Sequence, residues 1–484
     1  MPIRTRAPAL LTILAGLLIP VPALASGGGG DSGPLLIVLL LIAVVAAAYL
    51  LTHSVVEWLQ RVFLVATSIE YLILGALVGF ILFPGETTFG LLGWIRDATG
   101  WTFLPESGQL GTFEILAPFV ALAAGWIGLL YGMALDVQAL ISRRDGALRL
   151  AMVEGMLTAV PVAFVTYAIL VLFAPAAVPE GNQSLLLCAG VMGTIAWAGS
   201  TSAMDVVRRR YQVAGETLTT LVRAARFSDM LAILAFGVIF ASFHGLATPD
   251  LAAHAPTARA PTPAEWSGIT LGLGAGLGLM FAIYLDEDDS DNGTLLALVG
   301  IIAFASGAAY YLDLSEITIN LVLGMILVNV SRSGAKVRRT VQGTYRPVSL
   351  LLLLLAGLMW DFPPVVLSIA LSAVFFGVRF LGKAASGWVA SLTTPLRSDL
   401  FRGMIGQGDV AIAMAVSFKL VYDIGLDPAM RGTYVDDIID ATYTAILVGV
   451  MIHEVLAPRL LKGLLVDTGE IRREVGGNTT NGGT

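Results

Sequence analysis

The chain has 484 residues, of which 56% are hydrophobic and 13% are charged, and its mean hydropathy is +0.83. A soluble domain usually carries about 25% charged residues, so this chain has too little charge to cover a water-soluble protein of its length. The formal net charge of −7 and the single cysteine, Cys188, exclude a basic nucleic-acid surface and a disulfide framework. The composition predicts a polytopic membrane protein.

The first 25 residues have the pattern of a secretory signal peptide. Arg4 and Arg6 precede an apolar run and a small-x-small cleavage site that ends at Ala25. An uncleaved first helix is the alternative interpretation. Residues 26–33 are rich in glycine and are expected to form a flexible linker outside the cytoplasm. With either interpretation, the membrane part begins on the outer side.

About thirteen apolar segments follow, and each is long enough to cross a bilayer. They are predicted at 34–52, 62–83, 113–135, 147–174, 183–206, 217–243, 266–284, 294–312, 315–331, 345–360, 363–384, 398–421 and 435–457. Together they make one transmembrane domain, 34–457, followed by a short cytoplasmic tail, 458–484. Arginines such as Arg143, Arg208 and Arg338 fall in loops that this count places in the cytoplasm, as the positive-inside rule requires.

Several ionisable residues lie within these segments, where an unpaired charge is costly and marks a functional site by default. Asp229 is near the middle of segment 217–243, and Arg379 lies late in segment 363–384. Asp409 lies in the middle of its segment, and Glu70 and Glu154 lie within theirs.

Two segments are also interrupted by glycines and polar residues, at 190–202 and at 403–409. Glycines weaken a helix, and hydroxyl and amide side chains can satisfy the backbone that a break exposes. For a single segment, close packing through small residues would be the simpler explanation. Two such segments that run in opposite directions predict an inverted repeat with an ion site where the broken helices cross. The expected fold is an all-α membrane protein with about 13 spans and two crossed discontinuous helices.

Several motifs in this order resemble those of the monovalent cation:proton antiporters, chiefly the cation–proton antiporter-2 branch with its sodium/proton exchangers. The resemblance covers nearly the whole chain from about residue 50 and rests on modest motifs. The matching residues are Leu74–Gly79, Gly132–Asp136, Gly199–Ala203, Ser228-Asp229, Arg379 and Gly408-Asp409-Val410.

This resemblance implies a homodimer that exchanges sodium, potassium or lithium ions for protons by alternating access. Asp229 matches the ion- and proton-binding aspartate, and Ser200, Thr201 and Ser202 match neighbouring ion ligands. The chain departs from the family pattern at three positions. They are Ser228 in place of an acidic or amide residue, Asp409 in place of a glutamate, and Asp205 where the family is usually apolar.

The residues themselves suggest a mechanism. Burial disfavours a bare carboxylate, so Asp229 is expected to hold either a proton or a cation, and competition for one site couples the two ions. Oxygen ligands suit a hard cation, and Thr194 and Ser228 could supply them together with Ser200, Thr201 and Ser202. One cation for one proton predicts electroneutral exchange.

Arg379 is expected to act as a fixed counter-charge, because arginine almost never loses its proton. It could bridge the ends of the half-helices or pair with Glu70 or Glu154, and a snorkelling position at the membrane surface is the alternative. Lys383, one turn later, is expected to snorkel. Asp409, Glu70, Glu154 and Asp205 are expected to support the site.

Other functions are possible on the same sequence. A channel-like conduit, a relative that no longer exchanges ions and an ion-coupled carrier of a small organic acid are the alternatives, and a membrane-embedded enzyme fits least.

The predicted partners are Na⁺ or K⁺, H⁺, the lipid bilayer and a second copy of the chain, with no cofactor, no nucleic acid and no nucleotide-binding regulatory domain. The expected location is a bacterial inner membrane, with the N-terminus outside and the C-terminus in the cytoplasm.

Overall fold

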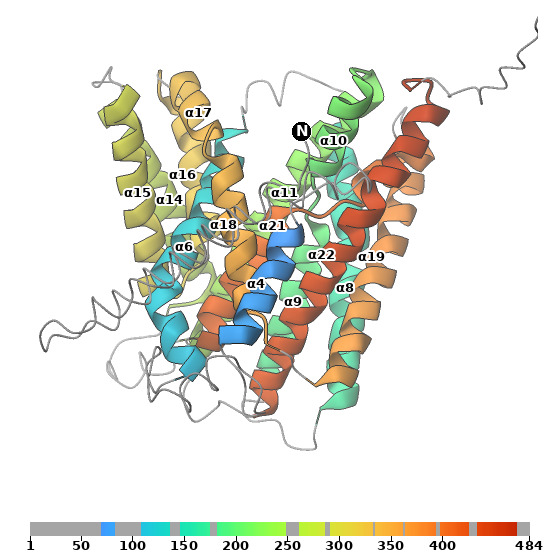
Figure 1. Cartoon of the computed structure of the whole chain (residues 1–484). Coiled ribbons are helices and arrows are strands. Elements are labelled where there is room, and N and C mark those ends of the chain that lie inside the picture. The colour runs from blue at the N-terminus through green and yellow to red at the C-terminus, as the bar shows by residue number, and fades with distance from the viewer. Residues whose placement is uncertain are drawn as a thin grey trace, which may run out of the picture. The chain divides into compact units, whose positions relative to one another are not determined.

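The computed structural model describes residues 69–82, 108–135, 146–174, 182–247, 261–285, 291–332, 334–361, 364–393, 397–424 and 433–471. Every regular element in these ranges is a helix, which confirms the predicted all-α fold class for the described part of the chain (Figure 1). The predicted signal peptide, the linker and the first predicted span, 34–52, lie outside the described residues.

The helices follow the predicted spans in chain order. Their bounds are α4 (Ile69–Leu82), α6 (Gly108–Met133), α8 (Ala147–Phe173), α9 (Gln183–Trp197), α10 (Ser202–Tyr211), α11 (Glu216–Ser242), α12 (His244–Ala247), α14 (Pro263–Leu285), α15 (Asp291–Tyr311), α16 (Glu316–Val330), α17 (Gly334–Gln342), α18 (Tyr345–Leu358), α19 (Val365–Thr393), η2 (Ser398–Leu400), α20 (Phe401–Met404), α21 (Asp409–Lys419), the π-helical turn η3 (Leu420–Ile424) and α22 (Tyr434–Asp467). Each predicted span from 62–83 onward overlaps a described helix or a broken helix pair.

The described residues contain seven helices that are long and apolar enough to cross a membrane, or up to eight when the bent pair Ser398–Met404 and Asp409–Asp423 is one span. That pair bends by 60° at its break. Shorter apolar helices account for the other predicted spans, at Ile69–Gly79, Leu296–Tyr311, Glu316–Val330 and Tyr345–Leu358. The predicted breaks are present, at 198–201 between α9 and α10 and at 405–408 between α20 and α21.

The chain divides into two compact units. The first comprises residues 1–62, 70–117 and 353–359, and its described part consists of three helix segments, 70–82 of α4, 108–117 of α6 and 353–359 at the end of α18. A Cβ atom on Gly75 of α4 would lie 2.1 Å from the carbonyl oxygen of Leu354, and one on Gly357 would lie 2.1 Å from that of Leu72. The glycines of the Leu74–Gly79 motif therefore permit close backbone contact.

The second unit contains the remaining residues, and two regions can be distinguished within it. In the first, which we call the glycine-packed region, α6, α14, α15, α16 and α17 share one apolar core. Glycines bring these helices together, because a Cβ atom on Gly132 would lie 2.1 Å from the carbonyl oxygen of Leu321, and one on Gly324 would lie 2.5 Å from that of Leu129.

The other region of the second unit, which we call the broken-helix region, consists of α8, α9, α10, α11, α19, α20, α21 and α22. A second apolar core joins α8, α10, α11, α19, α20 and α22 at one end of this region. Both interrupted helices belong to it, and so do most of the buried ionisable residues. The predicted functional site therefore lies in this region.

The two ends of the second unit differ in charge. Exposed arginines on α10, Arg208, Arg209 and Arg210, lie at the same end as α17, which carries Arg338 and Arg339 (Figure 1). We call this the basic end. At the opposite end, the acidic end, the Lys419 ammonium group forms ion pairs with three carboxylates. These belong to Asp361, Asp423 and Asp440.

Candidate functional site

The breaks in the two interrupted helices touch each other. The side-chain amide of Gln407, in the second break, donates a hydrogen bond to the carbonyl oxygen of Ile195 in the last turn of α9, with 2.9 Å between the atoms. A Cβ atom on Gly408 would lie 2.7 Å from Oγ of Ser200, in the first break. Gly408 thus has no room for a side chain where the two backbones cross. This arrangement is the predicted crossing of two discontinuous helices.

Arg379 of α19 is fully buried at this crossing, where it connects the two half-helix ends. Its guanidinium group donates hydrogen bonds to the carbonyls of Ala196 and Ala198 at 3.0 Å, and to those of Ile405 and Gly406 at 2.7 and 3.3 Å. The Ala196 carbonyl is in the last turn of α9, and the other three lie just after the ends of α9 and α20, where the helix dipoles concentrate negative charge. The planar, permanently charged guanidinium group neutralises both ends at once.

Of the positions considered for Arg379, bridging the half-helix ends is therefore the one observed, and snorkelling is not. The carboxylate of Glu154 is paired with another residue of α19, Lys383, which is fully buried. The expectation that Lys383 snorkels to the surface is wrong. Its ammonium group donates hydrogen bonds to the Glu154 carboxylate and to the carbonyl oxygen of Trp197 at the end of α9, which take the place of hydrogen bonds to water.

Asp229 lies in the middle of α11, fully buried, and faces the first break. Its Oδ1 atom accepts a hydrogen bond from the backbone N–H of Gly199, with 2.9 Å between nitrogen and oxygen. Its Oδ2 atom is buried and has no hydrogen-bond partner among the described residues. One carboxylate oxygen is thus fixed by the broken backbone, and the other is available for a proton or a cation.

Asp409 occupies the first turn of α21, directly after the second break, and is 6% exposed. Its Oδ1 atom accepts a hydrogen bond from the hydroxyl group of Tyr131 in α6, at 3.1 Å, while Oδ2 has no partner among the described residues. The crossing therefore holds two buried carboxylates, each with one oxygen unsatisfied within the described chain.

The hydroxyl groups expected as ion ligands occupy different environments. The Oγ atoms of Ser200 and Ser202 are 2.6 Å apart, and Ser202 also donates to the carboxylate of Glu454 in α22. The hydroxyl group of Thr194 donates to carbonyls one turn earlier in its own helix. Thr201 is half-buried at the N-terminal end of α10. Ser200 is 5% exposed and contacts the second break, as expected of a ligand at the crossing.

Ser228, Asp205 and Glu70 complete the set of predicted residues. The hydroxyl group of Ser228 donates to Oε2 of Glu154 at 2.7 Å, so this serine belongs to the Glu154–Lys383 pair. Asp205 is exposed in the first turn of α10. Glu70 is in α4, in the first of the two units.

Two residues at the site were not predicted. Glu454 is fully buried beside Ser202, and Tyr131 binds Asp409. The side-chain amide expected to satisfy exposed backbone is that of Gln407, which joins the two breaks. Glu454 carried a usable signal, because it is a carboxylate in the apolar segment 435–457. Tyr131 had none, since a tyrosine in a membrane helix is ordinary.

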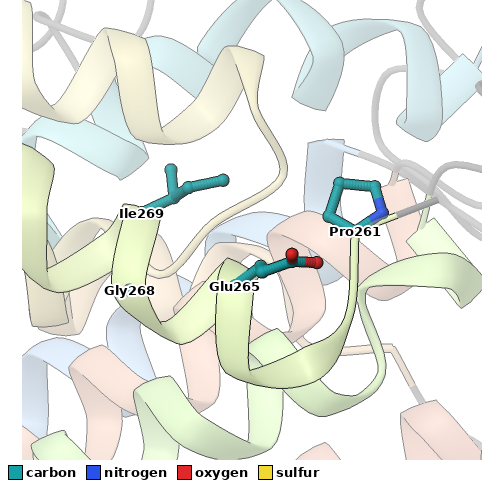
Figure 2. Close-up of a pocket in the computed structure, with 4 residues that line it drawn as sticks. All are labelled: Pro261, Glu265, Gly268 and Ile269. Carbon is teal, nitrogen blue, oxygen red and sulfur yellow. The ribbon is translucent and has the colours of Figure 1, made fainter. Parts of the chain in front are cut away.

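A pocket elsewhere on the surface has a different character (Figure 2). Pro261, Glu265, Gly268 and Ile269 line it at the start of α14. Its one charged side chain, Glu265, accepts hydrogen bonds from Thr262 and so closes the first turn of that helix. The pocket shares no residue with the crossing, and we assign it no role in ion binding.

Comparisons with known proteins give a match in structure and none in sequence. No protein-family model matches the chain, and no curated protein sequence matches it. A structure of the sodium proton antiporter MjNhaP1 from Methanocaldococcus jannaschii at pH 8 is similar with a TM-score of 0.61 and 14% identity, over 90% of this chain and 99% of the other. An electron-microscopy structure of the same antiporter is similar with a TM-score of 0.56 and 15% identity, over 88% and 97%. The chain therefore has the fold of a sodium proton antiporter.

Proposed function

We propose that the protein is a secondary transporter that exchanges a monovalent cation for a proton by alternating access. Na⁺ is the preferred candidate, with K⁺ and Li⁺ as alternatives. The observation that carries this proposal is the pair of unsatisfied carboxylate oxygens on Asp229 and Asp409 at the crossing of two broken helices. A buried site with excess negative charge and oxygen ligands suits a monovalent cation or a proton.

Asp229 is the proposed carrier, and Asp409 and Ser200 are the proposed additional ligands. The fold of the similar structures, which are of a sodium proton antiporter, agrees with this assignment. When the cation leaves, a proton on Asp229 replaces its charge, so the buried carboxylate never crosses the membrane bare.

The charge of the site supports electroneutral exchange. One monovalent cation and one proton carry the same charge, so the site has the same total charge with either one bound, whatever the charge of the buried groups Arg379 and Glu454. Arg379 keeps its charge throughout, because guanidinium groups do not deprotonate in proteins. The exchange of one cation for one proton therefore moves no net charge.

The proposed orientation places the basic end in the cytoplasm, with the C-terminus, and the acidic end outside. We also propose that the protein acts in a bacterial inner membrane as a homodimer. Fluorescence size-exclusion and cross-linking in detergent would test the oligomeric state.

The function is tested by proton flux in proteoliposomes with an imposed pH gradient. Addition of Na⁺, Li⁺ or K⁺ should collapse the gradient for the transported ion, and clamping the voltage should leave the rate unchanged. The Asp229→Asn variant, which cannot exchange a proton for a cation, should show no cation-dependent flux. Flux that follows the voltage in the wild-type protein would reject electroneutral exchange. No cation-dependent flux between pH 5.5 and 9 (about the working range of buried carboxylates) would reject the whole proposal.

A further inference from the structure

Glu316, in the first turn of α16, is a buried carboxyl group that the proposed exchange site does not use. Its side chain is fully buried. Oε2 accepts a hydrogen bond from the hydroxyl group of Ser417 in α21, with 2.9 Å between the oxygens. Oε1 is buried and has no hydrogen-bond partner among the described residues.

No charged side chain in the described part of the chain forms an ion pair with Glu316. Titratable groups on the elements around it have other partners. Lys419 pairs with three aspartates, Tyr422 donates to the carbonyl oxygen of Phe240, and His244 contacts the carbonyl oxygen of Leu312. Tyr131 binds Asp409, Asp229 accepts from Gly199, and Glu265 accepts from Thr262, while Asp313 lies in the connection before α16. A carboxylate with one hydroxyl partner and no counter-charge is strongly disfavoured in such a place, so in this conformation the carboxyl group holds a proton.

The Glu316–Ser417 contact joins the two regions of the second unit. α16 belongs to the glycine-packed region, and α21 begins at Asp409 of the exchange site, about 12 Å along the helix from Ser417 at 1.5 Å per residue. A second hydrogen bond crosses the same boundary, from Thr318 of α16 to the carbonyl oxygen of Ile233 in α11, at 3.1 Å. α17 follows the other end of α16, so Glu316 lies toward the acidic end.

We propose that Glu316 is a second proton-binding site, which takes its proton from the solution at the acidic end and controls the contact between α16 and α21. With its proton in place, the neutral carboxyl group tolerates burial and the contact stays closed. When the regions separate at this end, water reaches Glu316, its O–H bond breaks and the proton enters the solution. The proposal deepens the proposed exchange function and rests on it for the movement, since alternating access requires one bundle to move against the other.

The test measures the closure of the contact without measuring transport. Thr318→Cys places a thiol at the boundary, in a background in which the single native cysteine is removed by Cys188→Ala. This protein and its matched Glu316→Gln variant are reconstituted in liposomes and labelled with a membrane-impermeant maleimide over a range of external pH. The ratio of the two labelling rates cancels the pH dependence of the thiol itself and that of Asp313, which both proteins retain.

We expect the two proteins to label equally at acidic pH and the Glu316 protein to label several-fold faster at alkaline pH, because glutamine cannot ionise and open the contact. A ratio that stays constant across the pH range would overturn the proposal.

Infrared spectroscopy gives a second readout: the carbonyl band of a protonated carboxylic acid should be present in the wild-type protein at acidic pH and weaker in Glu316→Gln. Identical bands in both proteins would also overturn it.

The two proposals can fail separately. pH-dependent labelling without cation-dependent proton flux would retain the proton site and reject the exchange. Flux that Asp229→Asn abolishes, together with a constant labelling ratio, would retain the exchange and reject the role of Glu316.

Discussion

The glycine-packed and broken-helix regions solve the problem of packing membrane helices in opposite ways. In the first, α6, α14 and α16 are continuous, and glycines bring their backbones into contact around an apolar core. In the second, two helices are interrupted, and the exposed backbone is satisfied by the buried charge of Arg379. Backbone contact leaves little room for rearrangement, whereas hydrogen bonds around a break can be exchanged. The comparison supports the proposal that the broken-helix region binds and moves ions.

Removal of Arg379 should have the largest effect. Arg379→Met leaves four buried carbonyls without a donor, and each costs about 1–3 kcal/mol. We expect loss of a stable folded protein, measured by thermal unfolding in detergent. Arg379→Lys keeps the charge but cannot reach both half-helix ends with one planar group, so it should unfold at an intermediate temperature. A methionine variant as stable as the wild type would contradict the view that this charge holds the breaks together.

Disruption of the buried Glu154–Lys383 pair should have the next largest effect. Glu154→Gln and Lys383→Met each leave one buried charge without its partner, which costs about 3–5 kcal/mol. The double variant should be more stable than the sum of the single effects predicts, because it leaves no lone charge. Unfolding measurements on the wild type, the two single variants and the double variant complete this double-mutant cycle. Additive effects would show that the two charges act independently.

The glycine-packed region should respond to volume instead of charge. In Gly132→Ala, the added methyl group would lie 2.1 Å from the carbonyl oxygen of Leu321, so the two helices must separate, at a cost of about 1–3 kcal/mol. Gly276→Ala in α14 is the matched control, since a Cβ atom there meets no atom within 4 Å. The control should be neutral or slightly stabilising. Equal destabilisation by both substitutions would show that helix propensity, not contact, governs the region.

Sequence patterns located the two breaks and the residues that face them because the physical constraint is strong there. The glycines at 190–202 and 403–409 weaken a helix, and backbone that leaves a helix within lipid needs new hydrogen-bond partners, so a break was expected within each stretch. A buried arginine must likewise satisfy several hydrogen bonds. Asp229 and Arg379 were therefore found by depth alone, and the structure places both at the crossing.

The orientation of side chains around the crossing was not predictable in the same way. Ser200 and Ser202 are neighbours in the sequence, yet only Ser200 contacts the second break, while Ser202 donates to Glu454. Ser228 is adjacent to Asp229 but turns toward Glu154. Broken backbone has no fixed periodicity, so neighbouring residues face different partners. Lys383 was misjudged because its partner, Glu154, is far away in the sequence.

The smallest expected effect is at Asp313, in the connection between α15 and α16 at the edge of the glycine-packed region. Burial raises the pKa of this carboxyl group to about 6, above the ordinary value of about 3.9. The folded protein thus binds the proton more tightly than the unfolded chain, so stability declines as the pH rises from about 4 to about 6 and stays lower above that. Because the group is partly exposed, the penalty should be about 1 kcal/mol.

Asp313→Asn removes this penalty, so the variant should unfold at a higher temperature than the wild type at pH 7.5 and at the same temperature near pH 4 (about the ordinary aspartate pKa). The backbone of Asp313 has a φ of 51°, which asparagine also adopts readily, so the substitution introduces no strain. Asp313→Gly is the control: neither glycine nor asparagine titrates, so relief of that backbone conformation should separate these two variants by the same amount at both pH values. If the unfolding temperatures of Asp313→Asn and the wild type differ by the same amount at both pH values, burial does not destabilise the charged carboxyl group. The connection would then tolerate the charge as an ordinary surface loop does.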